Sequence, residues 1–229
     1  MRPISKRGKL DGQKERAEPS FGTEPIFFEE DMDLKTLQLL YHIDFPDQNL
    51  VMGEGNERAG IMLIGEAPGR EEEEQGRPFV GKAGRNLNEF LEVLGLEREA
   101  LFISNAVKFR PTKLNERGNL TNRPPTEKEI EAYRPYLFKE IEIVSPKFLV
   151  TLGGTSLRAL LGAEAQVGRL HGALTEFRGL PLFPLFHPAS IIYNPELKSV
   201  YLEDLQKLKD LLGKGEILPK PAQTLANPE

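Results

Sequence analysis

Residues 61–84, IMLIGEAPGREEEEQGRPFVGKAG, constrain the fold most, because they begin as a buried strand and continue into a glycine-bounded turn. The first four residues form a continuous apolar run, which is typical of a parallel strand covered on both faces. Gly65 and Gly69 then bracket a proline turn at the carboxyl end of this strand. In open α/β sheets, ligands bind just beyond such strand ends. We therefore expect a site to begin here, with Glu66 inside the turn.

A second glycine-rich segment, GRPFVGKAG, follows at 76–84. Phe79 is its one aromatic residue, and it stands between glycines, where a backbone can approach a flat ligand closely. Adjacent charges such as the four carboxylates at 71–74 can hardly converge on one ion, so we interpret them as a solvated loop and assign them no role. One region thus supplies both a carboxylate, at Glu66, and a ring.

Further apolar runs predict strands at 101–107, 148–152 and 182–186. Helical spacing of apolar residues and capping signals predict helices between and around the strands, at 34–43, 84–94, 126–143, 154–162 and 199–212. Buried strands that alternate with amphipathic helices indicate an α/β domain with a parallel sheet.

The 229 residues, of which 39% are hydrophobic, suit one domain with tails. Residues 1–16 carry six basic and two acidic side chains without an apolar period. We therefore predict a disordered basic arm over 1–25, which is either solvated without a binding role or contacts a polyanion. The domain itself is expected over 26–213 and a flexible tail over 214–229.

The sequence contains no cysteine, and its three histidines lie far apart. Disulfides, thiolate nucleophiles and thiolate-held clusters are therefore excluded, and we expect neither a metal nor a cofactor. No apolar run approaches the length that spans a membrane, and the first residues lack the apolar segment of a secretory signal. These features favour a cytoplasmic protein that does not bind membranes.

A basic loop follows the second predicted strand. Between 108 and 123 it carries five basic residues and one acidic residue among several Pro, Asn and Gly residues. This composition is typical of a loop that follows phosphates. Arg110, Lys113 and Arg117 are the side chains that we expect to contact them.

Polar or glycine residues stand at the ends of the four predicted strands, namely Glu66, Asn105, the 153–154 glycine turn and His187. Because the carboxyl ends of parallel strands meet at one edge of a sheet, these groups and Phe79 describe a pocket. Taken alone, Asn105 is either a satisfied turn residue or a ligand contact. The glycine turn either binds an anion at a helix N-terminus or is an ordinary turn between a strand and a helix.

The chemistry of these side chains favours one class of ligand. An Asn side chain offers a carbonyl acceptor beside an amide donor, which matches N3–H and O4 of uracil and mismatches cytosine. Phe79 would stack on such a base, and a histidine that donates to charge developing on a departing base would help to break a glycosidic bond. Ile191 and Ile192, in the loop after His187, would fill the space that a flipped nucleotide leaves.

Together these motifs resemble those of uracil-DNA glycosylases, and of the family-four enzymes of bacteria and archaea in particular. The resemblance runs over 51–212, and its motifs are GEGN at 53–56, GEAPG at 65–69, GRPFVGKAG at 76–84, SNAVKFRP at 104–111 and HPAS at 187–190. With the four predicted strands, it implies a three-layer α/β/α sandwich around a central four-stranded parallel sheet.

The resemblance also implies roles for single residues. Glu66 and His187 are the expected catalytic residues: His187 would contact O2 of the base, and Glu66 would position water or fix the base. Phe79 would stack on the base and Asn105 would read its Watson–Crick edge. The expected substrate-binding residues are Gly65, Ala67, Gly69, Phe79 and Asn105. The residues expected to contact DNA are Lys82, Arg110, Lys113, Arg117, Ser190, Ile191, Ile192 and Tyr193.

The chain departs from the family pattern at several positions. Family-four enzymes usually hold a four-iron, four-sulfur cluster on four cysteines, and this chain has none. Phe109 replaces the cysteine of the K-C-R-P segment, and Tyr133 replaces the one before R-P-Y-L. We predict that these rings, with Tyr41, pack together in place of the cluster. Ala67 stands where relatives have a water-binding aspartate, and Tyr193 where the family often has arginine.

We therefore expect a monofunctional DNA repair glycosylase, a hydrolase of base excision repair that flips uracil out of DNA and leaves an abasic site. Two other functions stay open. A damaged-DNA or single-strand DNA binding protein would have kept the pocket without turnover, and a nucleoside or nucleotide hydrolase would use the same strand ends on a free small molecule. The expected partner is uracil-containing DNA, and the protein is expected to act as a monomer.

Overall fold

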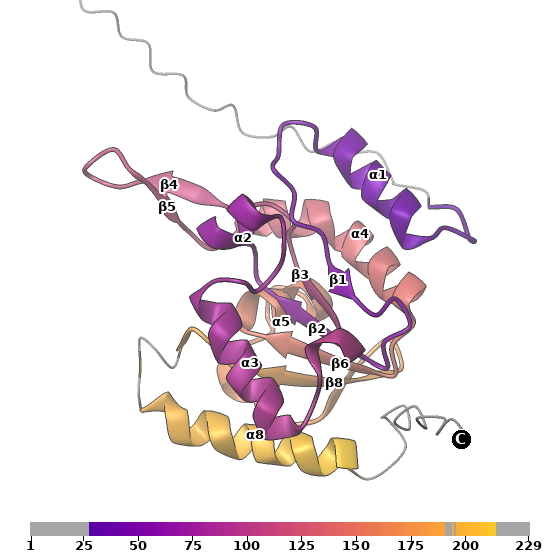
Figure 1. Cartoon of the computed structure of the whole chain (residues 1–229), viewed down its shortest axis with the longest axis vertical. Coiled ribbons are helices and arrows are strands. Elements are labelled where there is room, and N and C mark those ends of the chain that lie inside the picture. The colour runs from indigo at the N-terminus through magenta and orange to yellow at the C-terminus, as the bar shows by residue number, and fades with distance from the viewer. Residues whose placement is uncertain (1–27, 191–193, 195, 214–229) are drawn as a thin grey trace, which may run out of the picture.

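The structure, a computed structural model, describes residues 28–190, 194 and 196–213 (Figure 1). The predicted basic arm and tail lie outside the described residues. The strands are β1 (Glu54–Gly55), β2 (Ile61–Gly65), β3 (Phe102–Asn105), β4 (Thr112–Leu114), β5 (Leu120–Asn122), β6 (Phe148–Leu152), β7 (Thr175–Phe177) and β8 (Leu180–Leu185). The helices are α1 (Leu34–Asp44), α2 (Arg70–Gln75), α3 (Lys82–Leu94), the 3-10 helix η1 (Arg98–Ala100), α4 (Glu127–Val144), α5 (Gly154–Leu161), α6 (Val167–Leu170) and α8 (Leu197–Gly213).

The main sheet has six strands in the order β1-β3-β2-β6-β8-β7. The four central strands run parallel, and β2, β3 and β6 are buried along their whole length, as their continuous apolar sequences predict. The prediction of a four-stranded parallel sheet is right for this centre and wrong for the edges. There β1 pairs antiparallel with β3, and β7 pairs antiparallel with β8. These edge strands have two and three residues, which is too short for a periodic pattern.

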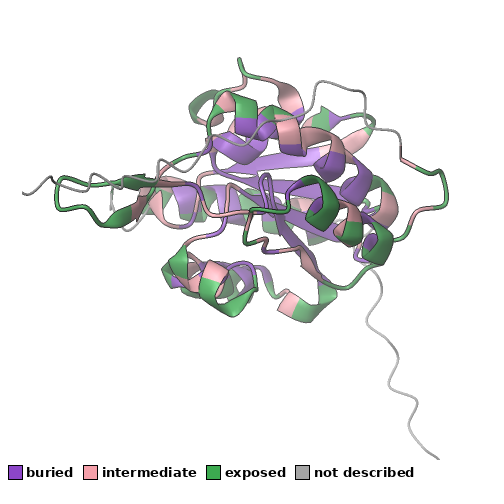
Figure 2. Ribbon diagram, turned by 90° about the horizontal axis from the view of Figure 1, so that it is seen from above, coloured by how far each residue is buried: buried purple, intermediate pink, exposed green. Residues whose placement is uncertain are grey.

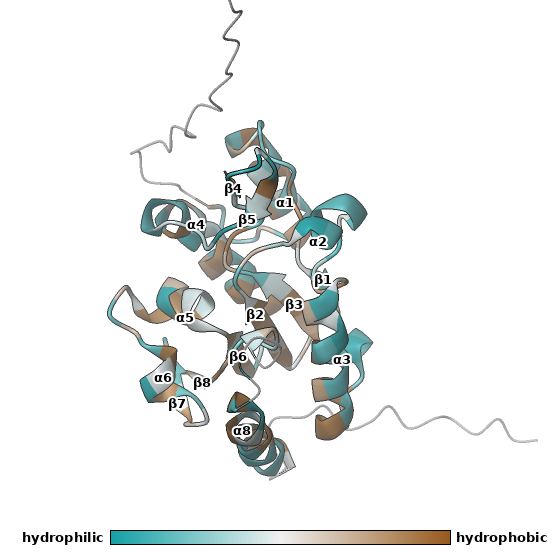
Figure 3. Cartoon of the chain, turned by 90° about the vertical axis from the view of Figure 1, so that its left-hand side faces the viewer, coloured by the Kyte–Doolittle hydropathy of each residue, from teal (hydrophilic) through white to brown (hydrophobic). Residues whose placement is uncertain are grey.

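Helices cover both faces of the sheet because successive strand residues point to opposite sides. In β2, Met62 and Ile64 belong to a core formed with α1, α4 and α5, whereas Ile61 and Leu63 belong to a core formed with α3 and α8. Figure 2 shows the buried sheet in the middle of the molecule with exposed residues on the outside of the helices. Figure 3 shows the same arrangement by hydropathy, with helices on either side of the sheet.

Helix α4 begins with a capping box, as the sequence predicts. Thr126 Oγ1 accepts a hydrogen bond from Glu129 N (3.3 Å), and Glu129 Oε2 accepts one from Thr126 N (2.6 Å). Arg123, which follows the β4–β5 hairpin, forms an ion pair with Glu129 (2.6 Å). The hairpin is thus fastened to the start of α4.

The interpretation of residues 71–74 as a solvated loop is wrong. These residues belong to α2, and the side chain of Glu72 is buried. A six-residue helix without apolar residues carries no hydrophobic period, so the sequence gives no sign of it. The sequence also predicts only an irregular basic loop over 108–123, where the structure has the antiparallel hairpin of β4 and β5.

Candidate active site

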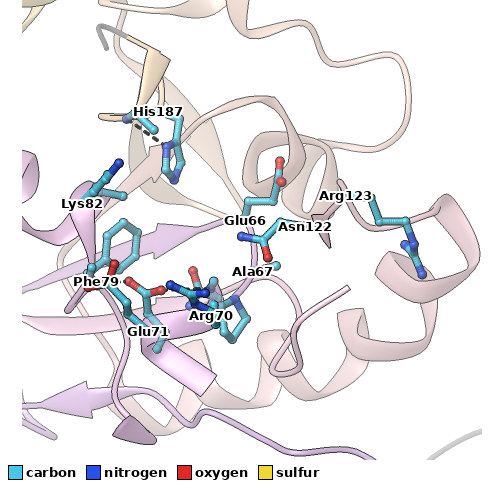
Figure 4. Close-up of a pocket in the computed structure, with 16 residues that line it drawn as sticks. Glu66, Ala67, Arg70, Glu71, Phe79, Lys82, Asn122, Arg123 and His187 are labelled. Carbon is cyan, nitrogen blue, oxygen red and sulfur yellow. Dashed lines mark hydrogen bonds between the residues drawn. The ribbon is translucent and has the colours of Figure 1, made fainter. Parts of the chain in front are cut away.

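A cavity of about 410 Å³ opens where the central parallel strands end. Figure 4 shows Phe79, Lys82 and His187 along one side of it, with Glu66 and Ala67 across from them. The predicted site residues that line the cavity are Glu66, Ala67, Gly69, Phe79, Lys82, Asn105 and His187. Glu66, Asn105 and His187, which lie far apart in the sequence, therefore meet because parallel strands end at one edge of the sheet.

Gly65, the last residue of β2, lets Asn105 and Phe79 approach each other. It pairs with Asn105 across the β2–β3 ladder. A Cβ atom at Gly65 would lie 2.4 Å from Asn105 Oδ1 and 2.4 Å from Phe79 Cζ, far inside normal contact. Asn105 is only 3% exposed and Phe79 only 6%. Any larger residue at position 65 would push these two side chains out of the pocket.

The backbone of Phe79 is held in an unusual conformation. Its φ of 53° lies in the left-handed region, which costs a non-glycine residue energy and persists only where the surroundings enforce it. Arg98 enforces it by donating to the carbonyl oxygens of Pro78 (2.6 Å) and Phe79 (3.3 Å). Gly84 in α3 leaves room for the same carbonyl group, because a Cβ atom there would lie 1.9 Å from Phe79 O.

His187 is a neutral hydrogen-bond donor in this pocket. Burial lowers the pKa of His187 to about 4, with the Glu72 carboxylate opposing that shift. Its Nδ1 accepts a hydrogen bond from Ala189 N (3.2 Å), so the single proton of the neutral ring lies on Nε2. The His187 ring lies near that of Phe79, with 6.1 Å between centroids and 24° between planes. The imidazole can therefore donate from Nε2 without carrying a charge.

The glycine turn at the end of β6 packs against His187. Gly153 has a φ of 98°, and a Cβ atom on it would lie 3.2 Å from His187 Cβ. Helix α5 begins directly after this turn, and Thr155 in its first turn donates a hydrogen bond to Glu66 Oε2. The group that meets the start of this helix is thus the protein's own Glu66 carboxylate, which fixes the Glu66 side chain.

Glu72 ties together the two loops that the sequence singles out. Its Oε2 accepts from Gly69 N (3.1 Å) in the first loop, and its Oε1 accepts from Gly81 N (2.8 Å) in the second. Both bonds are charge-assisted, and the carboxylate lines the cavity. Sequence reasoning missed Glu72 because nothing in a run of four glutamates distinguishes the one that turns inward.

A buried ion pair lies behind Asn105. The ammonium of Lys108 donates to Glu140 Oε2 (2.8 Å), to Ser104 Oγ (2.6 Å) and to the backbone carbonyl of Asn105 (2.9 Å). The Lys108 side chain is 0% exposed and that of Glu140 is 5% exposed. Burial lowers the pKa of Lys108, and Glu140 opposes the shift. The pair therefore holds the end of β3, from which Asn105 projects.

The residues predicted to contact DNA fall into three groups. The side chain of Arg110 is mostly buried, and its guanidinium pairs with Glu73 (3.1 Å) and donates to Asn122 Oδ1 (2.7 Å). Lys113 and Arg117 are exposed on the β4–β5 hairpin. Lys82 lines the cavity, and Ser190 lies in the turn after His187, where its N–H donates to His187 O. The remaining three, Ile191, Ile192 and Tyr193, lie outside the described residues.

The rim of the cavity also includes residues that sequence reasoning missed. Asn122 and Arg123, at the end of the hairpin, line it beside Ala67 and Gly69. The only available signal was their position in the basic segment 108–123, which gave no reason to place them at the strand ends.

The predicted packing of Phe109, Tyr133 and Tyr41 is confirmed. The Tyr133 ring lies 5.7 Å from that of Phe109 and 5.9 Å from that of Tyr41, and it stacks on Phe45 at 4.1 Å. Tyr136 extends the same cluster. Tyr133 is fully buried, whereas Phe109 is only half-buried. Apolar rings fill this region, and with no cysteine in the chain these residues do not fit an iron–sulfur cluster.

Neither a group of metal-ligating side chains nor a membrane-spanning helix is present in the described residues. Across residues 28–190, 194 and 196–213, no three His, Cys, Asp or Glu side chains gather into a group that could hold a metal ion. None of the helices in this part of the chain combines the length and apolar character needed to cross a membrane.

Comparison with known proteins agrees with the geometry of the pocket. The family model described as the uracil DNA glycosylase superfamily matches residues 52–209. The type-4 uracil-DNA glycosylase of Sulfurisphaera tokodaii is 41% identical over 175 residues, which cover 71% of this chain and 74% of that protein. Those of Saccharolobus solfataricus (40% identity; 74% and 79% covered) and Archaeoglobus fulgidus (36%; 73% and 84%) are similarly related. This chain therefore belongs to the uracil DNA glycosylase superfamily.

Proposed function

We propose that the protein removes uracil from DNA by hydrolysing the bond between the base and its sugar, which leaves an abasic site. The observation that carries this proposal is the placement of Asn105, whose side chain is 3% exposed at the end of β3 and still lines the cavity. An amide held there offers uracil a donor for O4 and an acceptor for N3–H. The type-4 uracil-DNA glycosylases among the relatives support the same substrate.

Selectivity would follow from the fixed position of this amide. Cytosine presents an acceptor at N3 and a donor at N4, so it would face Asn105 with two mismatched groups. A buried polar group left without a partner costs about 1–3 kcal/mol, which disfavours the wrong base. Phe79, whose ring is held beside Asn105 across Gly65, would stack on the flat base.

His187 would stabilise the charge that develops on the departing base. When the glycosidic bond breaks, its electron pair moves to N1 of uracil, and the negative charge spreads to O2. A neutral imidazole with its proton on Nε2 can donate to O2, and it needs no reorganisation to do so. A water oxygen then bonds to the sugar carbon C1′, and the proton that the water loses passes to solvent or to the base.

The attacking water needs an acceptor in the first loop of the pocket. Ala67 offers no carboxylate, so Glu66, which lines the cavity, is the acidic candidate in this loop. One of its oxygens is held by Thr155. We propose that the carboxylate either orients the water or fixes the base through a bound water molecule.

Three further properties belong to this proposal. We propose that the protein acts on DNA as a monomer, that it works in the cytoplasm, and that it needs no metal or cofactor. The aromatic cluster around Tyr133 would fasten the loops that an iron–sulfur cluster fastens in family-four enzymes. Purified protein is then expected to be colourless.

An assay for abasic sites separates this function from the two alternatives. The wild-type protein is incubated with uracil-containing DNA, with matched uracil-free DNA and with free deoxyuridine, and DNA is then cleaved at abasic sites and sized. The proposal expects strand breaks only at uracil. Tight DNA binding without breaks would indicate a non-catalytic binding protein, and release of uracil from deoxyuridine would indicate a small-molecule hydrolase.

A further inference from the structure

Two large apolar side chains stand exposed on the β4–β5 hairpin. Leu114 is 68% exposed and Leu120 is 52% exposed. The two residues are direct partners across the antiparallel ladder, so their side chains lie next to each other on one face of the hairpin. A leucine pair that the described part of the chain leaves uncovered on a narrow hairpin indicates a contact with another molecule.

This leucine pair faces the same way as a residue of the pocket. Side chains alternate along a strand, so Leu120 and Asn122 share one face of β5, and Asn122 lines the cavity. Two residues of strand span about 7 Å, which is about two nucleotide steps along a DNA strand. DNA that placed a base in the cavity would therefore pass close to the leucine pair. Figure 1 shows the hairpin projecting from the body of the protein beyond α2.

The hairpin is firmly held at its base. Arg123 donates to Thr112 O (3.2 Å) across the two strands and pairs with Glu129 in α4. On the other side, Asn122 is fixed by Arg110, which also pairs with a carboxylate of α2. These contacts present the leucines in a fixed position relative to the cavity, so little order has to be gained when they bind.

The charge of the hairpin favours DNA over a second protein as its partner. Arg117 is exposed in the turn that joins the two strands, Lys113 is exposed on the face of β4 opposite to Leu114, and Glu116 is the one acidic residue of the hairpin. Basic side chains on the same narrow hairpin as an apolar pair suit a polyanion whose base faces are apolar, because the leucines can contact bases while the basic side chains attract the phosphates. Apolar wedges that enter between base steps are a known means of bending or unstacking DNA.

We propose that Leu114 and Leu120 form an apolar DNA contact, which packs against bases about two nucleotides from the flipped uracil. This inference rests on the proposed function for the identity of the base in the cavity. The leucine pair would help to hold the distorted strand while the nucleotide occupies the pocket.

A matched pair of double variants tests this contact. Leu114→Gln/Leu120→Gln makes the hairpin polar, and Leu39→Gln/Ile43→Gln makes the same kind of change on α1, where the two side chains are 58% and 68% exposed. Affinity is measured by fluorescence anisotropy on a long duplex with an abasic-site analogue. Excision is measured on the same duplex with uracil and on a trinucleotide with uracil at its centre, which is too short to reach the hairpin.

The hairpin variant is expected to bind the long duplex about tenfold more weakly or worse, with an unchanged salt slope because no phosphate contact is lost. Its rate on the trinucleotide should equal that of the wild type, and the α1 variant should match the wild type throughout. Equal affinity of the two double variants would overturn the proposal. The proposal would also be overturned if the wild type and the α1 variant dimerised with rising concentration and the hairpin variant did not, because the leucines would then join two copies.

Each outcome can be read separately from the proposed function. If the wild-type protein released no uracil from any substrate, the proposed function would fail, and the anisotropy comparison on the long duplex would still decide the role of the leucines. Both double variants change exposed side chains, so their melting temperatures are expected to match that of the wild type. The single variant Leu114→Gln should give an intermediate loss of affinity, because the loss should follow the number of leucines removed and not the misfolding of one variant.

Discussion

Replacing Lys108 with Met removes the ammonium group behind the pocket. That group lies 2.8 Å from Glu140 Oε2 and 2.9 Å from the carbonyl oxygen of Asn105. The substitution leaves the Glu140 carboxylate almost completely buried, with Ser104 Oγ as its remaining donor at 2.8 Å. It also leaves the carbonyl of Asn105 without this donor. Because the side chains are similar in length, little volume is lost, and the effect isolates the charge.

The expected cost is about 3–5 kcal/mol, which is typical of breaking a buried ion pair by removing one partner. This is a large share of the free energy of unfolding of a domain, which is usually about 5–15 kcal/mol. The double variant Lys108→Met/Glu140→Met removes both charges at once. Because a buried pair replaced by apolar side chains is often nearly neutral, the double variant should be more stable than either single variant.

Equilibrium unfolding in urea at neutral pH measures these differences, with the slope of the transition checked for each variant. The four proteins form a double-mutant cycle, and the coupling energy between positions 108 and 140 is expected to reach about 3 kcal/mol. Additive effects of the two substitutions, or a cost below about 1 kcal/mol for Lys108→Met, would refute the reasoning. Either result would mean that the ammonium group does not sit as a charge beside Glu140.

Four further predictions concern the pocket, the hairpin and the aromatic cluster. His187→Ala should lower the single-turnover rate of uracil excision by about a hundredfold or more while DNA binding is kept. The pKa of His187 is about 4 in the folded protein, below its usual 6.5, so the unfolded chain takes up this proton first as the pH falls. His187 should therefore make the free energy of unfolding decrease as the pH falls from 6.5 to 4, and a pH series of unfolding curves for the wild type and His187→Ala tests this. Neutralising Lys113 or Arg117 should flatten the salt dependence of DNA binding by about one unit of log slope for each lost phosphate contact, and an unchanged slope would mean that the side chain stays in solvent. Tyr133→Ala should cost about 3–5 kcal/mol and Phe109→Ala, which is half-buried, only about 1–2 kcal/mol; equal costs in urea unfolding would contradict the packing described.

The centre of the fold could be predicted because its signals are local. The run IMLI predicts the strand β2, and the capping box at Thr126 predicts the start of α4, each from a few neighbouring residues. The meeting of Asn105, His187 and Phe79 could also be predicted, since parallel strands place their carboxyl ends at one edge. The edge strands β1 and β7 could not, because so few residues leave no period.

The supports of the site could not be predicted, because their partners lie elsewhere in the sequence. Lys108 meets Glu140 across 32 residues, and Arg98 reaches the carbonyl of Pro78 across 20. Glu72 binds Gly81 N from within a run of identical side chains. In none of these cases does the local sequence identify the partner, and only the fold shows that the charge is turned inward.

The role of Asn105 as the group that reads the base is tested most directly by the ratio of uracil to cytosine excision by Asn105→Asp under single-turnover conditions. Its control is the wild-type protein on the same two DNA duplexes. An ionised carboxylate lacks the amide donor for O4, so the variant should excise uracil more slowly, and its ratio of uracil to cytosine excision should be lower than that of the wild type. Uracil excision at the wild-type rate with cytosine still rejected would contradict this role, because Asn105 would then not be the group that reads the base.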